Sequence, residues 1–503
     1  MALLYFAILL SVLPLLLYYY FTRTFNYWKK RNVVSPKPLP LVGNMLDSCL
    51  RRKNIGLVFE EIYNMFPDEK VVGIYTMTTP QLLIRDLDII KLIMIKDFDV
   101  FMDRGQDFGN EGLAGNLFTT DGDSWRTLRS RFTPLFTSGK LKNMFYLMDE
   151  CADKLIYYME KECHKRPEQE IRDLVQKFTI ASISACAFGV DYDTFGDDML
   201  DALKRVDKLT LEPSYVQELD MMFPGIIKKI GIGAFPKAVE KFFFDLVKNV
   251  TSLRGGKPTA RNDFMDLILE LRQQGTIQSK EKFGEANLSL EITDDVIAAQ
   301  AFVFYIAGYE TSATTMSYVL HELADNPKIQ DKLIEELDET LRANDGKLSY
   351  NSLKEMKYID KVISETLRLH SLVEPLARRA RVDYKIPGTD VVVKKGQRVF
   401  LSPRGIHRDE KYYDNPEVFD PERFSPEAVG ARHSCAYLPF GIGPRNCIGM
   451  RFGQIQTRLC LAKILTKFRV EPSLNTKKIL EVEPNRALIG PKDGVYVNFV
   501  RRK

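Results

Sequence analysis

Cysteine pairs and an excess of one charge are both missing from this sequence. Its 7 cysteines stand at scattered spacings with no C-x-x-C pair. This argues against a disulfide framework and a zinc site, and it favours a reducing compartment. Lys and Arg number 71 against 67 Asp and Glu, a net charge of +4. That charge is too dilute to indicate nucleic-acid binding, so we expect no nucleic-acid partner.

Internal repeats and extremes of composition are absent as well. Hydrophobic residues make up 45% and charged residues 27% of the 503 residues, which excludes a disordered, collagen-like or multi-span membrane chain. Strand-like runs stand at 71–75 and 81–84 around a turn at Thr79 and Pro80, at 391–393 with 397–401, and at 487–489 with 495–500. The remaining pattern is mostly helical, so we expect one large, mainly α domain with small β-sheets.

Charge is missing altogether from the first 22 residues. As a helix this apolar run would be roughly 28 Å long, close to the ~30 Å of a bilayer core. Basic residues between Arg23 and Arg31 follow it, Tyr18 and Trp28 suit the membrane interface, and no cleavage site is visible. We therefore expect a transmembrane signal anchor at 1–22 with the rest of the chain in the cytosol; a buried core helix is the alternative. A basic, Pro-rich linker is expected at 23–44 and a catalytic domain at 45–503.

One predicted helix is unusually long. Thr293 is a suitable N-cap and Asn326 with Pro327 a suitable end, which gives about 34 residues or roughly 50 Å. Its centre, 296–307, is apolar all round, as expected for burial on every side.

Three residues interrupt that apolar centre: Gly308, Glu310 and Thr311. A mid-helix glycine costs about 1 kcal/mol relative to alanine, and a buried carboxylate needs a partner or a shifted pKa. Either these residues serve a function, or Gly308 permits a close helix crossing and Glu310 points outward.

A sharper motif lies near the C-terminus, at 440–449, before a helical pattern from Met450 to Phe468. Cys447 precedes the helix start, where free amides and the dipole favour a thiolate. The letters match F-x-x-G-x-R-x-C-x-G, and the sequence here resembles the haem-thiolate monooxygenases, the cytochrome P-450 family. A chance match is on the order of one in millions per starting point; a buried inert cysteine is the alternative.

Further motifs follow the order of that family over nearly the whole chain. They are W-x-x-x-R at Trp125 and Arg129, A-G-x-E-T at 307–311, E-x-x-R at 365–368, and P-E-R-F at 421–424. The resemblance implies the cytochrome P-450 fold as a single domain behind the anchor. It also implies that Glu365, Arg368 and Arg423 form a buried network that locks the cysteine loop.

The resemblance further implies haem b as the cofactor, with Cys447 as the proximal iron ligand. A thiolate there pushes electron density toward the iron and favours O–O cleavage. Arg445, Trp125, Arg129 and Arg378 would bind the haem propionates. Phe440 would shield the sulfur, and Gly443 and Gly449 would let the backbone pass closely around it.

On the opposite side of the haem, the same resemblance assigns the oxygen chemistry to 307–311. Ala307 and Gly308 would leave space for O2 beside the helix backbone. Thr311 would hold a proton-donating water there, and Glu310 would feed protons to it.

The chain also lacks a G-x-G-x-x-G segment behind a strand and any flavin segment, so it cannot take electrons from NADPH itself. The resemblance implies a separate NADPH–cytochrome P-450 reductase, with cytochrome b5 as a second candidate, at the endoplasmic reticulum membrane. Docking candidates are the basic residues Arg126, Arg131, Lys140 and Lys142, although an ordinary solvated face explains them equally well.

Within the family the sequence is most similar to animal microsomal forms, and 125–142 to insect detoxification members. The expected substrate is therefore a lipophilic small molecule, a xenobiotic or an endogenous lipid. Pocket candidates are Phe118, Phe302, Val303, Ile306, Val373, Leu376 and Ile489. The apolar loop Met221–Ile227 is either a second bilayer contact or packed on the core.

Two rival functions remain open from the sequence. One is a haem-thiolate isomerase or dehydratase that acts on peroxides without a reductase, and the other is a membrane-tethered haem protein without turnover. The presence of both Thr311 and Glu310 argues against each of them.

Overall fold

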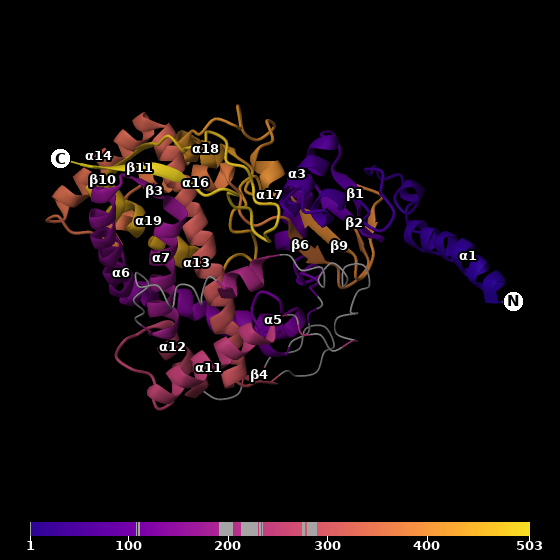
Figure 1. Cartoon of the computed structure of the whole chain (residues 1–503), viewed down its shortest axis with the longest axis horizontal. Helices are drawn as coiled ribbons and strands as arrows, with labels where there is room; N and C mark the ends of the chain where they lie inside the picture. Colours follow the sequence, from indigo (N-terminus) through magenta and orange to yellow (C-terminus); the bar gives the residue numbers. More distant parts are fainter. Residues whose placement is uncertain are drawn as a thin grey trace.

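The computed structural model describes residues 2–106, 108, 111–190, 205–212, 230, 233, 235–273, 277–278 and 289–502, with side chains from residue 12 onward except at 277–278 and 289–290. The loop at 221–227 therefore lies outside the described residues. Within them the chain is mainly helical with small sheets, as the sequence predicts (Figure 1).

The helices of the described chain run in the following order: α1 Ala2–Thr22, α2 Leu46–Cys49, α3 Ile55–Met65, α4 Leu87–Lys91, α5 Gly122–Phe132, α6 Ser138–Lys165, α7 Ile171–Ile183, α11 Lys237–Leu253, α12 Phe264–Gln273, α13 Asp294–Asp325, α14 Pro327–Ala343, α15 Tyr350–Glu355, α16 Tyr358–Leu369, α17 Pro403–His407, α18 Pro426–Ala431 and α19 Met450–Lys467. The strands are β1 Val71–Thr76, β2 Thr79–Ile84, β3 Glu168–Glu170, β4 Ile277–Gln278, β5 Ser289–Leu290, β6 Leu376–Arg379, β7 Tyr384–Lys385, β8 Val392–Val393, β9 Arg398–Leu401, β10 Phe468–Pro472 and β11 Tyr496–Arg501.

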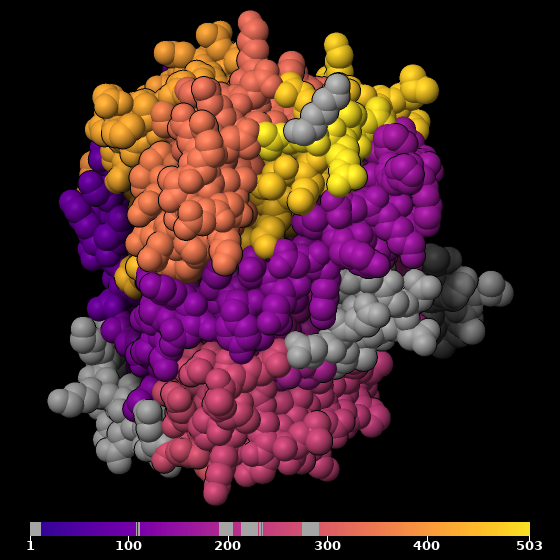
Figure 2. All heavy atoms as spheres, turned by 90° about the vertical axis from the view of Figure 1, so that its left-hand side faces the viewer, coloured from indigo at the N-terminus to yellow at the C-terminus, as the bar shows by residue number. Residues whose placement is uncertain are grey.

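Helix α13 forms as the sequence predicts and runs through the helical part of the molecule. The side chain of its N-cap, Thr293, accepts a hydrogen bond from Val296 N, and the helix ends before Asn326. It packs against α7, α11, α16 and α19. Figure 2 shows the outer face of this region, where α14 and the C-terminal strands lie above α6 and the α11–α12 region lies below it.

The largest sheet has the order β1-β2-β9-β6 and lies on the side from which α1 extends (Figure 1). β1 and β2 form the predicted hairpin, but the turn is Met77 and Thr78, with Met77 at φ 55°, and Pro80 is inside β2. The late strands are also arranged differently from the prediction. β9 pairs with β2 and β6 while β8 pairs with β7, and 487–489 form no strand.

The N-terminal segment differs most from its sequence interpretation. Trp28, expected at a membrane interface, is fully buried in the protein, and its Nε1 donates to Ile74 O at 3.1 Å. Its ring occupies the space above Gly73, where an added Cβ would lie 2.4 Å from the Trp28 ring. The predicted connector is therefore packed on β1, and Gly73 N also donates to Val34 O.

Helix α1 itself leaves the body of the molecule and carries the N-terminus away from it (Figure 1). Among the residues whose side chains are described, no helix combines the length and hydropathy needed to cross a membrane.

Candidate active site

Cys447 lies in a tight loop that ends at the start of α19. Its amide donates to Phe440 O at 2.9 Å, and Asn446 N donates to Gly443 O at 3.1 Å. Gly441 and Gly443 have φ 67° and 78°, a region that favours glycine. A Cβ on Gly443 would meet Met94 O at 1.9 Å. Gly443 thus lets the loop lie against Met94, and its expected role in the path of the backbone around the sulfur stays a prediction.

Cys447 combines an accessible side chain with a position that protein atoms surround. Of the seven free cysteines, Cys447 is exposed, Cys49 is partly exposed and the other five are buried. Burial nevertheless raises the pKa of its thiol, while the amide of Gly449 and the charges of Arg129 and Arg104 oppose this. The expected lowering by the helix start is therefore outweighed by desolvation. Coordination of a metal cation would replace the proton and give the thiolate, because metal coordination deprotonates a thiol.

The residues of the expected buried network lie together. Arg368 donates to both carboxylate oxygens of Glu365, at 2.7 and 2.8 Å, and both side chains are fully buried. Arg423 Nε lies 3.3 Å from Glu365 Oε1. Burial raises the pKa of Glu365, and the two hydrogen bonds from Arg368 are the largest effect against it.

His407 connects this network to the chain that leads into the cysteine loop. Arg368 donates to His407 O at 2.8 Å, and Leu438 N donates to His407 Nε2 at 2.8 Å. His407 must therefore be neutral with its proton on Nδ1, in agreement with burial that lowers its pKa to about 3. Tyr437 also donates to Ser364 O, at 2.9 Å.

Between Ile297 and Leu320, helix α13 is buried except along one stripe and at Ile306 and Gly308. Val303, Ala307 and Thr311 recur every four residues and are accessible, and Ala307 is exposed. This corrects the prediction of burial on every side. α19 crosses α13 at Gly453, where an added Cβ would lie 3.7 Å from Ser312 Oγ. The stripe is therefore on α13, and the loop that holds Cys447 leads into α19, which contacts α13 at Gly453.

Thr311 has a hydroxyl on this accessible stripe. Its Oγ1 donates to Ala307 O at 2.7 Å, so its lone pairs remain available to accept a hydrogen bond. Gly308, in contrast, faces Ile183 of α7, whose Cδ1 would lie 2.9 Å from an added Cβ. The close helix crossing that the sequence left open is present at Gly308, and a space for O2 beside it stays a prediction.

Glu310 is buried in an ion cluster. Its carboxylate accepts hydrogen bonds from Arg172, from Gln176 at 3.0 Å and from Arg486 at 3.0 Å, with Thr314 at 3.4 Å. Glu310 thus neither points outward nor hydrogen-bonds to Thr311. The expected transfer of protons from Glu310 to Thr311 stays a prediction; in this structure both carboxylate oxygens accept hydrogen bonds from guanidinium or amide groups.

The pocket candidates divide into two groups. Phe118 is 43% exposed, and Val303, Ile306, Val373 and Leu376 are partly exposed. Phe302 and Ile489 are buried instead. The ring of Phe302 packs on Phe235 and Phe243, and Ile489 Cδ1 packs close to Gly56. When a helix is apolar on every side, its sequence does not show which side faces the core. The sequence therefore could not predict that Phe302 is buried while its neighbour Val303 is partly exposed.

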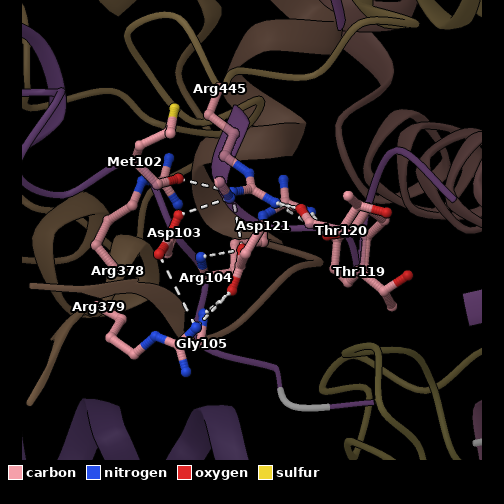
Figure 3. A network of polar contacts seen from close by, with 12 residues as sticks. Met102, Asp103, Arg104, Gly105, Thr119, Thr120, Asp121, Arg378, Arg379 and Arg445 are labelled. Atoms are coloured by element: carbon pink, nitrogen blue, oxygen red, sulfur yellow. Dashed lines mark hydrogen bonds and ion pairs between the residues drawn. The ribbon is translucent and has the colours of Figure 1, made fainter. Parts of the chain in front are cut away.

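Two of the expected propionate ligands, Arg378 and Arg445, lie in a cluster that also contains Arg104 and Arg379 (Figure 3). Arg445 lies over the Trp125 ring at 4.7 Å and donates to Met102 O at 2.6 Å and to Asp121 at 3.0 Å. Arg129 instead donates to Asn446 O and Oδ1, at 2.8 and 2.9 Å. Sequence reasoning missed Arg104 and Asp121, because charged residues in a polar loop look like ordinary surface.

The guanidiniums of Arg104, Arg378 and Arg445 are close enough to disfavour one another's charge. Burial first, and then the neighbouring guanidiniums, lower the pKa of Arg104 and of Arg378, the latter to about 9; burial also lowers that of Arg445. Arg378 Nε and Arg445 Nε are buried without a hydrogen-bond partner in the described part of the chain. The cluster therefore suits an anionic ligand with several acceptor oxygens.

These residues fit a haem. Among the described residues no three His, Cys, Asp or Glu side chains gather around one point, so an iron bound by Cys447 would take its other ligands from a cofactor. The guanidiniums match the two propionates of haem b in charge and geometry. The accessible stripe of α13 would face its other side.

The docking candidates are partly neutralised by acidic neighbours. Arg126 forms ion pairs with Asp99 at 2.6 Å and Asp123 at 3.8 Å, and Lys140 lies 3.7 Å from Glu270. Arg131 is partly exposed and Lys142 is exposed.

Comparison with known proteins gives consistent matches over the whole chain. The family model for cytochrome P-450 matches residues 34–499. Cytochrome P-450 6B6 of Helicoverpa armigera is 62% identical over 99% of each chain. Cytochrome P-450 6B1 of Papilio polyxenes is 54% identical over 99% of this chain and 100% of its own. Cytochrome P-450 6a2 of Drosophila melanogaster is 41% identical over 98% and 99%.

The buried ion pair gives a stability prediction. Arg368→Ala leaves the Glu365 carboxylate buried without its partner, and we expect it to cost about 3–5 kcal/mol of unfolding free energy. Lys477→Ala, which breaks the exposed pair with Asp493, is the control and should change nothing measurable. Chemical unfolding followed by circular dichroism measures both, and equal stability of the two variants would contradict the role of the pair.

Proposed function

The chain belongs to the cytochrome P-450 family, and we propose that it inserts one oxygen atom of O2 into a lipophilic small molecule with electrons that a separate NADPH-dependent reductase delivers. The enzyme is a monooxygenase with haem b as its cofactor and with O2 and NADPH-derived electrons as co-substrates. The observation that carries the proposal is the accessible Cys447 thiol beside a buried set of guanidiniums.

Haem bound to a cysteine thiolate supplies the oxygen activation, and the protein supplies position and protons. Cys447 is the proposed iron ligand, and the amide of Gly449 donates to its sulfur. The hydrogen bond from Cys447 N to Phe440 O fixes the loop. Arg445, Arg378 and Arg104 are proposed to hold the propionates, with Trp125 beneath Arg445 and Arg129 fixing the loop at Asn446.

Thr311 is the proposed proton-handling residue of α13. Its hydroxyl lies on the accessible stripe and can accept a hydrogen bond from a water while it donates to Ala307 O. We assign Glu310 a positioning role, because its ion pairs join α13 to Arg172 of α7 and to Arg486.

The substrate and the redox partner follow from the same surfaces. Apolar, partly exposed side chains at Phe118, Val303, Ile306, Val373 and Leu376 suit a lipophilic xenobiotic or endogenous lipid. For the reductase, Arg131 and Lys142 are the proposed contacts, because Arg126 and Lys140 already have acidic partners.

We propose that α1 anchors the enzyme in the endoplasmic reticulum membrane, with the catalytic domain in the cytosol. Its 21 residues include no charged residue, and Leu15, Tyr18 and Tyr19 are each more than 60% exposed. The basic residues Arg23, Lys29, Lys30 and Arg31 follow it, as the positive-inside rule requires for a cytosolic domain.

The first test concerns the iron ligand. Cys447→Ser should abolish the red-shifted band of the reduced carbon-monoxide complex and all reductase-dependent oxygenation of a lipophilic panel. The other cysteines offer matched controls, since Cys49→Ser changes a partly exposed thiol and Cys460→Ala a buried one. Loss of the band in either control would overturn the ligand assignment.

The second test concerns proton delivery. Thr311→Ala should still consume NADPH with reductase present, but more oxygen should leave as hydrogen peroxide and less as product. Loss of a general-acid route typically costs on the order of 100-fold. Thr315→Ala is a control, because its hydroxyl is bonded to Thr311 O and it is buried. An unchanged ratio of product to NADPH in Thr311→Ala would rule out this role.

The third test concerns the anchor. Removal of residues 1–22 should release protein from membranes and keep the haem spectrum, because Thr24 and Trp28 still pack on the sheet. Removal of residues 1–30 also deletes Trp28, and it should lower the thermal unfolding midpoint. Sedimentation of membranes and thermal unfolding measure the two effects, and loss of the haem spectrum in the shorter deletion would contradict the separate anchor.

A further inference from the structure

Asp121 occupies an unusual position for a helix N-cap. It immediately precedes α5, where an aspartate normally accepts hydrogen bonds from the first amides of its own helix. Here its side chain makes no such bond. The amide of Gly122 donates instead to Asp103 Oδ1, at 2.9 Å. A residue outside the helix thus replaces the local cap, and the Asp121 carboxylate is free for other partners.

Those partners come from three separate segments (Figure 3). Asp121 Oδ1 accepts from Arg104 N at 2.8 Å and from Arg445 Nη1 at 3.0 Å. Asp121 Oδ2 accepts from Gly105 N at 2.9 Å and from Arg379 Nη2 at 3.3 Å. The carboxylate therefore joins the loop after Asp103, the end of β6 and the cysteine loop.

Asp121 is also the counter-charge that three guanidiniums share. It raises the pKa of Arg104, of Arg378 and of Arg445, against the lowering effect of burial on each. The side chain of Arg445 is 1% exposed and that of Asp121 is 16% exposed. Solvent therefore screens this interaction little, and the charge of Asp121 acts directly on the cluster.

The geometry points to Asp121 as a positioning residue of the haem site, which aims Arg445 and sets the net charge beside the haem so as to lower its reduction potential. This inference rests on the proposed function. A negative charge near the haem stabilises the ferric form, which carries one more positive charge than the ferrous form, so the carboxylate favours oxidised iron. Its four hydrogen bonds keep that charge at a fixed place.

The test is the midpoint potential of the full-length holoenzyme. Asp121→Asn removes the charge with little change of shape, and we expect an upward shift of the potential. Asp123→Asn is the matched control, because Asp123 lies two residues away in the first turn of α5, is more buried than Asp121 (6% against 16% exposed) and has its ion pair with Arg126 instead. We expect its potential to equal that of the wild type. No shift in Asp121→Asn, or the same shift in both variants, would overturn the inference.

Two further variants keep the inference testable if Asp121→Asn does not retain haem. Asp121→Glu restores the charge, and its potential should lie at or near the wild-type value. Arg379→Gln removes a cation from the same ion pair, and its potential should fall. An upward shift in Asp121→Glu, or no fall in Arg379→Gln, contradicts the inference. The carbon-monoxide band of the wild type tests the proposed function separately, so its absence and the failure of Asp121 to tune the potential are different results.

Discussion

The structure depends on buried charges that fix the loop of the exposed Cys447 thiol. Arg368 and Glu365 pair where solvent does not reach, and such a pair gains little net stability because both groups lose their hydration. What the pair contributes is geometry. Through His407 it fixes the backbone at Leu438, two residues before Phe440, whose carbonyl then receives the amide of Cys447. The position of the sulfur is thus set by polar contacts far from it in sequence.

A second constraint concerns the surroundings of α13. This helix packs in the protein core and also lines the candidate active site. Its buried faces pack on α7 and α19, and Gly308 allows the approach to Ile183. One stripe, from Val303 through Ala307 to Thr311, stays accessible in the described chain. The ion pair of Glu310 with Arg172 joins the helix to α7. The carboxylate that looks catalytic in the sequence therefore also contributes to the position of α13.

The sequence predicts those features that depend on neighbouring residues and misses those that depend on distant ones. The ends of α13, the β1–β2 hairpin and the start of α19 follow from caps, alternation and glycine positions, and they are observed. Trp28 was assigned to a membrane interface because it follows an apolar run, yet a distant glycine, Gly73, provides the space that buries it. Arg104 could not be recognised for the same reason, since its role arises from Arg378 and Arg445, which lie hundreds of residues away.

The guanidinium cluster shows how folding and cofactor binding are linked. Three guanidiniums are buried together, and the charge of Asp121 compensates them only in part. Their burial therefore disfavours the folded protein, as their lowered pKa values indicate. A dianionic ligand that binds there removes this cost in the folded state alone, so binding stabilises the fold by mass action. Arginine suits this arrangement better than lysine, because a planar guanidinium keeps its charge when buried and still presents Nε to a second acceptor. The unpartnered Nε atoms of Arg378 and Arg445 are therefore available as the donors that the proposed cofactor site requires.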